Sequence, residues 1–166
     1  MPRVFPFYFI FCIFDIIILT IIIIYEADIL EIKMKFHHIG KPVALETIKD
    51  NIDTKYSELY DMYSLDMENN LSLPIELHAF GPKSSLDKRI QTMPHVAFTV
   101  NDLNHALKEN EIIMPKYTPF KDYTCAIILV NNQPIELIET TLTEREIWGN
   151  GIFKDSILYP NSSKTK

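Results

Sequence analysis

The chain has 166 residues, of which 47% are hydrophobic and 23% are charged, and its formal net charge is −6. This length and composition are typical of one folded domain, or of two small halves that share a core, and not of a disordered chain. The negative charge leaves no basic surface for nucleic acid, so no nucleic-acid partner is expected. Cys12 and Cys125 are too few for a disulfide framework, which favours a reducing compartment such as the cytoplasm.

The first 33 residues differ in composition from the rest of the chain. Residues 4–25 are almost entirely Ile, Phe, Leu and Tyr, and as a helix they would extend roughly 33 Å, enough to cross a bilayer. A signal peptide is disfavoured because the apolar run is too long and no small-residue cleavage site follows. We expect that Met34 is the authentic start and that residues 1–33 are a misassigned extension, which a native N-terminus at Met1 would disprove. The alternative is a membrane anchor through residues 4–25.

Hydrophobic periodicity and turn residues predict the elements of the first half after Met34. We expect a strand at residues 35–43 and one or two helical turns at residues 43–51. A loose strand at residues 56–63, a polar turn at residues 66–70 and a buried strand at residues 73–80 follow. A polar linker with a short helical turn is expected at residues 83–92.

The second half is predicted to follow the same series more fully. We expect a strand at residues 94–100 and a helix at residues 103–110. Three further strands are expected at residues 111–114, 124–130 and 134–139. Asn101 and Asp102 are typical residues for capping the start of that helix. Residues 131–133 form a tight polar turn between the last two strands.

The tetrapeptide Pro-Ile-Glu-Leu occurs twice, 60 positions apart (136 − 76), with Glu76 and Glu136 as its acidic residues. Each glutamate lies inside a short apolar strand, where an unpaired carboxylate is costly. Aligning the halves also places His38 over His95, 57 positions apart (95 − 38). This alignment predicts an internal duplication, in which each half has one histidine on its first strand and one glutamate on its last.

The duplicated histidines and glutamates predict a metal site. If the halves pack with pseudo-twofold symmetry around a curved sheet, the four side chains converge in one concave pocket. Two imidazoles and two carboxylates suit a divalent ion such as Zn²⁺, Ni²⁺, Co²⁺, Mn²⁺ or Fe²⁺. Four protein ligands leave one or two positions for water or substrate, which favours catalysis over a structural ion. The predicted metal ligands are His38, Glu76, His95 and Glu136.

Other polar side chains are interpreted as structural or solvent-exposed. His37 alternates with His38 along a strand and is expected to face away from it. His78 is more typical of a packed histidine, although a role as acid–base group or substitute ligand beside Glu76 stays open. Glu139 is expected on the opposite face of its strand, in solvent. Five further side chains are candidates for contact with an anionic or carbonyl substrate, although each is more typical of ordinary surface: Lys41, Arg89, Lys116, Tyr117 and Tyr123.

Four segments of the chain together resemble the vicinal oxygen chelate superfamily: HHIGKPV, PIELHAF, PHVAFTVNDL and PIELIE. This superfamily includes glyoxalase I, methylmalonyl-CoA epimerase, extradiol dioxygenases and the bleomycin- and fosfomycin-resistance proteins. The resemblance implies an α+β fold of two tandem βαβββ modules that form curved mixed sheets around a central cleft. It also implies that the metal ligands come from the first and last strands of each module, which supports the same four residues.

The resemblance covers about residues 34–140, with modules at about 34–82 and 93–140. The first module is shorter than in the enzymes of known reaction, which leaves the substrate open. Residues 1–33 form the apolar N-terminal segment described above, and residues 141–166 form a C-terminal tail.

The leading functional interpretation is a glyoxalase-like, metal-dependent lyase or isomerase that acts on a small substrate with vicinal oxygens through a metal-stabilised enediolate. The resemblance to glyoxalase sites implies that Glu76 or Glu136 acts as the general base. Two alternatives stay open: a non-enzymatic protein that binds a small molecule such as an antibiotic, and an extradiol dioxygenase, which needs only two histidines and one glutamate. The expected partners are a small-molecule substrate and, as in some relatives, a second copy of the chain in a homodimer. A cytoplasmic location is expected unless the segment 4–25 is genuine and anchors the chain to a membrane.

Overall fold

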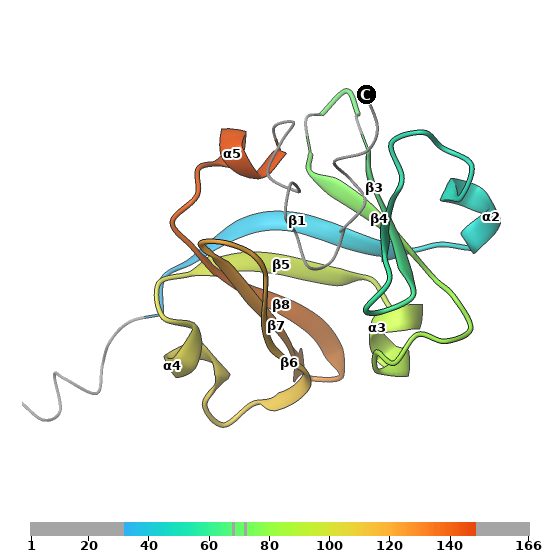
Figure 1. Cartoon of the computed structure of the whole chain (residues 1–166). Coiled ribbons are helices and arrows are strands. Elements are labelled where there is room, and N and C mark those ends of the chain that lie inside the picture. The colour runs from blue at the N-terminus through green and yellow to red at the C-terminus, as the bar shows by residue number, and fades with distance from the viewer. Residues whose placement is uncertain (1–31, 68, 72, 149–166) are drawn as a thin grey trace, which may run out of the picture. The chain divides into compact units, whose positions relative to one another are not determined.

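A computed structural model of the chain describes residues 32–67, 69–71 and 73–148. These residues form a mixed α+β fold in which eight strands make one curled sheet and the helices are short (Figure 1). The predicted α+β class is confirmed. The apolar segment 4–25 and the end of the tail, residues 149–166, lie outside the described residues, and so does the prediction about the chain start.

The first half contains β1 (Met34–Pro42), α2 (Leu45–Ile48), β2 (Lys55–Ser57), β3 (Met62–Met67) and β4 (Ile75–Phe80). The strands predicted at residues 35–43 and 73–80 are therefore confirmed. The polar turn predicted at residues 66–70 begins too early, because Asp66 still belongs to β3 and pairs with Glu76 of β4. Pairing with a neighbouring strand there outweighs the local preference of polar residues for a turn.

The second half contains α3 (Lys88–Thr92), β5 (His95–Val100), α4 (Leu103–Leu107), β6 (Glu111–Phe120), β7 (Tyr123–Val130), β8 (Gln133–Thr140) and α5 (Glu144–Trp148). The predicted cap is confirmed, because the Asp102 side chain accepts a hydrogen bond from the backbone N–H of His105. Asn131 and Asn132 have φ of 49° and 64°, a conformation that asparagine tolerates in tight hairpin turns.

The sheet has the strand order β2-β3-β4-β1-β5-β8-β7-β6. β1 and β5 pair antiparallel at its centre and so join the two halves, which lie side by side in Figure 1. β1 pairs parallel with β4, and β5 pairs parallel with β8. The remaining neighbours pair antiparallel, so the sheet is mixed, as predicted.

The two faces of the sheet pack against different parts of the chain. Because side chains alternate along a strand, Ala126 and Ile128 of β7 pack with α4, whereas Cys125 and Ile127 belong to the core of the opposite face. Ile48 of α2 packs on the first half, against Leu65 and Ala79. The face that carries Cys125 is the one that holds the candidate site.

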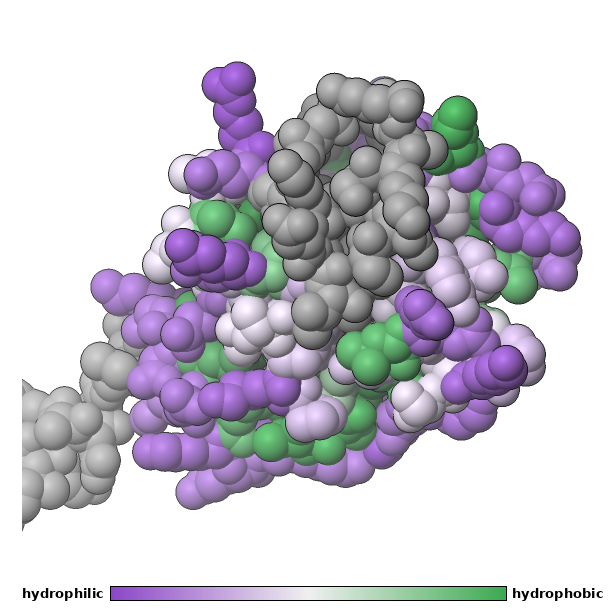
Figure 2. All heavy atoms as spheres, viewed as in Figure 1, coloured by the Kyte–Doolittle hydropathy of each residue, from purple (hydrophilic) through white to green (hydrophobic). Residues whose placement is uncertain are grey.

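The outer surface is largely polar on the side shown in Figure 2, where hydrophilic residues surround smaller apolar patches. None of the helices in the described part of the chain has the length and apolar character needed to span a membrane.

Candidate metal centre

The curled sheet holds a cavity of about 90 Å³. Its polar lining comes from β1, β3, β4, β5 and β8: His37, His38, Asp66, Glu76, His78, His95 and Glu136. The other walls are largely apolar and aromatic, and include Phe80, Ile90, Met114, Phe120 and Ile127. A ligand in this cavity would therefore have a polar end facing the histidines and an apolar body against the opposite wall.

The four predicted ligand residues come together at the polar end of the cavity. Nε2 of His38 lies 3.7 Å from Oε2 of Glu76 and 3.4 Å from Oε2 of Glu136. Nε2 of His95 lies 3.3 Å from the same Oε2 of Glu136. All four residues belong to one chain, and their role as ligands stays a prediction.

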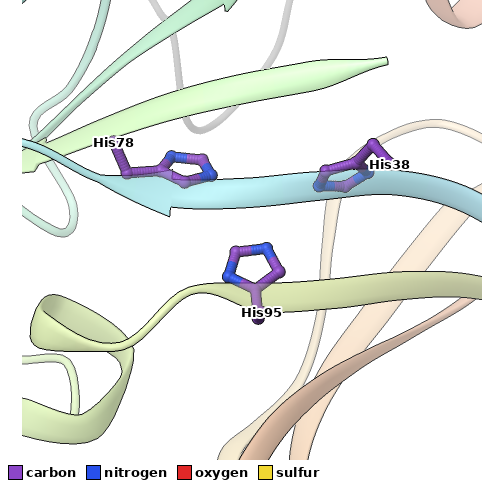
Figure 3. A group of neighbouring side chains, drawn as sticks. All are labelled: His38, His78 and His95. Atoms are coloured by element: carbon purple, nitrogen blue, oxygen red, sulfur yellow. The ribbon is translucent and has the colours of Figure 1, made fainter. Parts of the chain in front are cut away.

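His78 joins this group, although the sequence favoured a packed residue. One ring nitrogen from each of His38, His78 and His95 lies within 4.8 Å of the others, and all three residues are buried. Figure 3 shows the ring of His95 rising from β5 between the rings of His38 and His78. Three buried histidines this close can hold a metal ion. The spacing of two residues between Glu76 and His78 on one strand was the signal available in the sequence.

The pairing of β1 with β5 explains why the histidines meet. Ile39 lies opposite Val96, and on either side of this pair His38 lies opposite Ala97 and Gly40 lies opposite His95. A Cβ atom at Gly40 would come 2.0 Å from Cε1 of His95, so the missing side chain leaves the space that the His95 ring occupies.

His37 does not face away from His38, so the expectation from strand alternation is wrong. The register between β1 and β5 shifts between Phe36 and His38, which makes His37 the extra residue of a bulge. Both histidines are consequently buried, at 2% and 3% exposure. The Nδ1 atoms of His37 and His38 lie 2.7 Å apart, a hydrogen-bond distance. This contact directs Nε2 of His38 toward the two glutamates, as second-shell contacts of metal-binding histidines do.

Burial shifts the pKa values of the histidines and of the glutamates in this cluster in opposite directions. Burial lowers the pKa of His38 to about 4 and that of His78 well below its usual value, so both imidazoles are neutral at neutral pH. Burial and then the nearby Asp66 raise the pKa of Glu76 to about 8. For Glu136 burial acts in the same direction, but the surrounding histidines outweigh it and lower the pKa to about 2. Without a metal, the imidazoles of His38 and His78 are therefore neutral and lie near the ionised carboxylate of Glu136.

The other predicted contacts divide between the cavity and the surface. Tyr117 and Tyr123 line the cavity, but the three predicted cations are not among its described lining residues. Arg89 instead pairs with Asp87 and Glu111. Glu139 is exposed, as predicted, but its carboxylate accepts a hydrogen bond from the backbone N–H of Leu103 at the start of α4. The sequence pattern around Glu139 gave no indication of this contact with α4.

The comparisons with known proteins give no match: no protein-family model and no curated protein is significantly similar to this chain.

Proposed function

We propose that the chain is a metal-dependent lyase or isomerase that acts on a small substrate with adjacent oxygens. The observation that carries this proposal is the convergence of two histidines and two glutamates, from four different strands, at the polar end of an otherwise apolar cavity. The resemblance of the motifs to the vicinal oxygen chelate superfamily supports the same proposed activity. Membership of that superfamily is part of the proposal.

The proposal includes an origin as two tandem βαβββ modules. A twofold axis through the Ile39–Val96 pair would exchange His38 with His95. The same axis would exchange Gly40 with Ala97. Glu76 pairs with Gly40 and Glu136 pairs with Ala97, so the two glutamates would be exchanged as well. The first module is the smaller one: β2 and β3 have 3 and 6 residues, against 10 and 8 in β6 and β7.

A divalent ion, when bound, supplies a positive charge that holds two substrate oxygens and stabilises negative charge next to them. His38, His95 and Glu136 would hold the ion, since their side-chain atoms lie closest together. Glu76 lies slightly farther from His38, at 3.7 Å, and its side chain is 18% exposed, against 11% for Glu136. Glu76 is therefore the carboxylate placed to accept a proton from the substrate carbon once it is ionised, which in the metal-free chain requires a pH above its raised pKa of about 8.

The test combines metal analysis with a proton-exchange assay. Purified protein should contain one divalent ion per chain, and Glu136→Gln and His95→Ala should lose it. When α-hydroxyketones are incubated with metal-loaded protein in D₂O, the hydrogen next to the carbonyl should exchange. Glu76→Gln should retain metal and lose at least a hundredfold of the exchange rate, within the usual range for one acid–base group. Wild-type protein that binds no metal would contradict the proposal and favour a metal-free binding protein.

A second candidate is an Fe²⁺-dependent dioxygenase that cleaves the ring of a catechol. Two histidines and one carboxylate with open positions form the ligand set of many non-haem Fe²⁺ oxygenases. His38, His95 and Glu136 are such a set, with His–Glu distances of 3.4 Å and 3.3 Å, and the aromatic wall of the cavity suits a ring. Yellow ring-opened product from Fe²⁺-loaded protein, catechol and oxygen would favour this candidate over the first.

A further inference from the structure

We propose that His78 is itself a metal ligand, so that three histidines and Glu136 hold the ion while Glu76 remains outside the ligand set. This inference rests on the proposed metal site, and it changes the ligands that the duplication alone predicts. His78 has no counterpart in the second half, where the equivalent position of β8 is Ile138. The site would thus be asymmetric although the strands around it are equivalent.

The first support is the orientation of the ring. His78 follows Glu76 by two residues on β4, so both side chains lie on the face of the sheet that lines the cavity. Nδ1 of His78 lies 3.0 Å from Oγ of Ser64 on β3, and Ser64 is completely buried. The ring stacks on that of His95, with centroids 5.5 Å apart and an interplanar angle of 26°. These contacts hold Nε2 toward the other two histidines.

The second support is the cost of the arrangement without a cation. His78 is 7% exposed, and its Nε2 makes no hydrogen bond within the described residues. A buried polar atom without a partner is unfavourable by roughly 1–3 kcal/mol. The imidazole nitrogens nearby belong to His38 and His95. Each of these nitrogens carries either a lone pair or a single proton, as Nε2 of His78 does. A cation shared by all three rings satisfies these nitrogens together.

The third support is the position of Glu76 relative to the rings. Its Oε2 lies 3.8 Å from Nε2 of His78 and 3.7 Å from Nε2 of His38. These distances are longer than the 3.4 Å and 3.3 Å from Glu136 to Nε2 of His38 and of His95, so Glu136 is the better placed carboxylate ligand and Glu76 lies at the edge of the histidine cluster, next to the cavity. With His78 on the ion, Glu76 stays available as the proton acceptor of the proposed reaction.

A site with three imidazole nitrogens and one carboxylate has a predictable metal preference. Imidazole suits Zn²⁺, Co²⁺, Ni²⁺ and Fe²⁺, whereas Mg²⁺ and Ca²⁺ favour oxygen ligands. We therefore expect strong Zn²⁺ and Co²⁺ binding, and at least a thousandfold weaker binding of Mg²⁺.

The experiment compares Co²⁺ and Zn²⁺ binding by the full chain with that of His78→Gln, His78→Ala and Ser64→Ala. His105→Ala is the matched control, because His105 lies on α4, away from the cavity lining. We expect the two His78 variants to bind Co²⁺ at least a hundredfold more weakly and to have an altered visible absorption spectrum. Ser64→Ala should weaken binding by about 10- to 100-fold, because it removes the contact that orients the ring. His105→Ala should match the wild type.

Circular dichroism of each variant separates loss of a ligand from loss of the fold, and the Gln variant retains a polar side chain of similar length. A folded His78→Gln protein with wild-type Co²⁺ affinity and spectrum would overturn the role of His78 and leave the proposed function intact. A wild-type chain that binds neither ion would overturn both. If His78 variants keep the ion but lose turnover, His78 acts on the substrate instead and the ligand role is wrong.

Discussion

At the scale of single residues, Gly40 gives the clearest link between sequence and site. A methyl group there would overlap the His95 ring, with Cβ 2.0 Å from Cε1. We predict that Gly40→Ala displaces the ring, weakens metal binding at least tenfold and destabilises the fold by about 1–3 kcal/mol, as overpacking does. Isothermal titration and thermal unfolding measure the two effects.

The neighbouring variant Lys41→Ala is the control for this prediction, because Lys41 is exposed on the same strand. It should change neither metal affinity nor stability by a measurable amount. Equal metal affinity in Gly40→Ala and wild type would mean that His95 is not a ligand in this position.

The pKa of Glu76 predicts how stability of the metal-free protein depends on pH. Because the pKa is raised to about 8, from an ordinary value of 4.5, the folded chain at about pH 7 holds a proton that the unfolded chain has released. Unfolding free energy should therefore fall as pH rises, by about 1 kcal/mol between about pH 7 and pH 8. His38 and His78 oppose this change only slightly, because their lowered pKa values keep them neutral in the folded chain and an unfolded histidine is already mostly neutral at about pH 7.

Urea unfolding at a series of pH values, in the presence of a chelator, measures this slope. Glu76→Gln should remove it, because the amide does not titrate. A slope that persists in Glu76→Gln would have to come from another group.

At the scale of secondary-structure elements, β8 carries two glutamates with opposite roles. Glu136 faces the histidines, whereas Glu139 accepts a hydrogen bond from the N–H of Leu103 at the start of α4. We predict that Glu136→Gln removes metal binding, while Glu139→Ala keeps it and lowers the unfolding free energy by about 1 kcal/mol, because Ala cannot accept the hydrogen bond from Leu103 and the usual cost of losing a helix cap is of this size. Each variant is the control for the other, with metal titration and urea unfolding as the two measurements.

The elements also show which sequence patterns were informative. Apolar runs predicted β4, β5, β7 and β8, because a buried strand is largely apolar along its length, and alternation predicted β1. The extent of β3 and β6 was not predictable, since Asp66 and the prolines of β6 are local turn signals. Partner strands outweigh those signals, and β6 tolerates its prolines because it is an edge strand.

At the scale of the whole molecule, the cavity is lined by acidic side chains and not by Lys or Arg, as far as the described residues show. Asp66, Glu76 and Glu136 line it, and no Lys or Arg is among the described lining residues. We predict that metal-free protein binds neutral 4-methylcatechol at least tenfold more tightly than the anionic 3,4-dihydroxybenzoate, because the ionised Glu136 carboxylate repels an anion in a partly buried site. Calorimetric titration of both compounds makes the comparison, and tighter binding of the anion would contradict this view of the cavity.

The sequence by itself determined the repeated His and Glu positions and the strands that carry them. These are local patterns, since strand periodicity and the Pro-Ile-Glu-Leu repeat can be read without knowing any partner strand. They were sufficient to bring His38, Glu76, His95 and Glu136 into one candidate site.

The tertiary structure determined the orientations and contacts that depend on how distant segments pair. The bulge that buries His37 arises from the pairing of β1 with β5, and the orientation of the His78 ring depends on its contact with Ser64 across β3 and β4. Glu139 reaches α4 only because that helix packs beside β8. Each of these contacts joins residues from separate segments, and the free energy of such contacts is not expressed in the local sequence pattern.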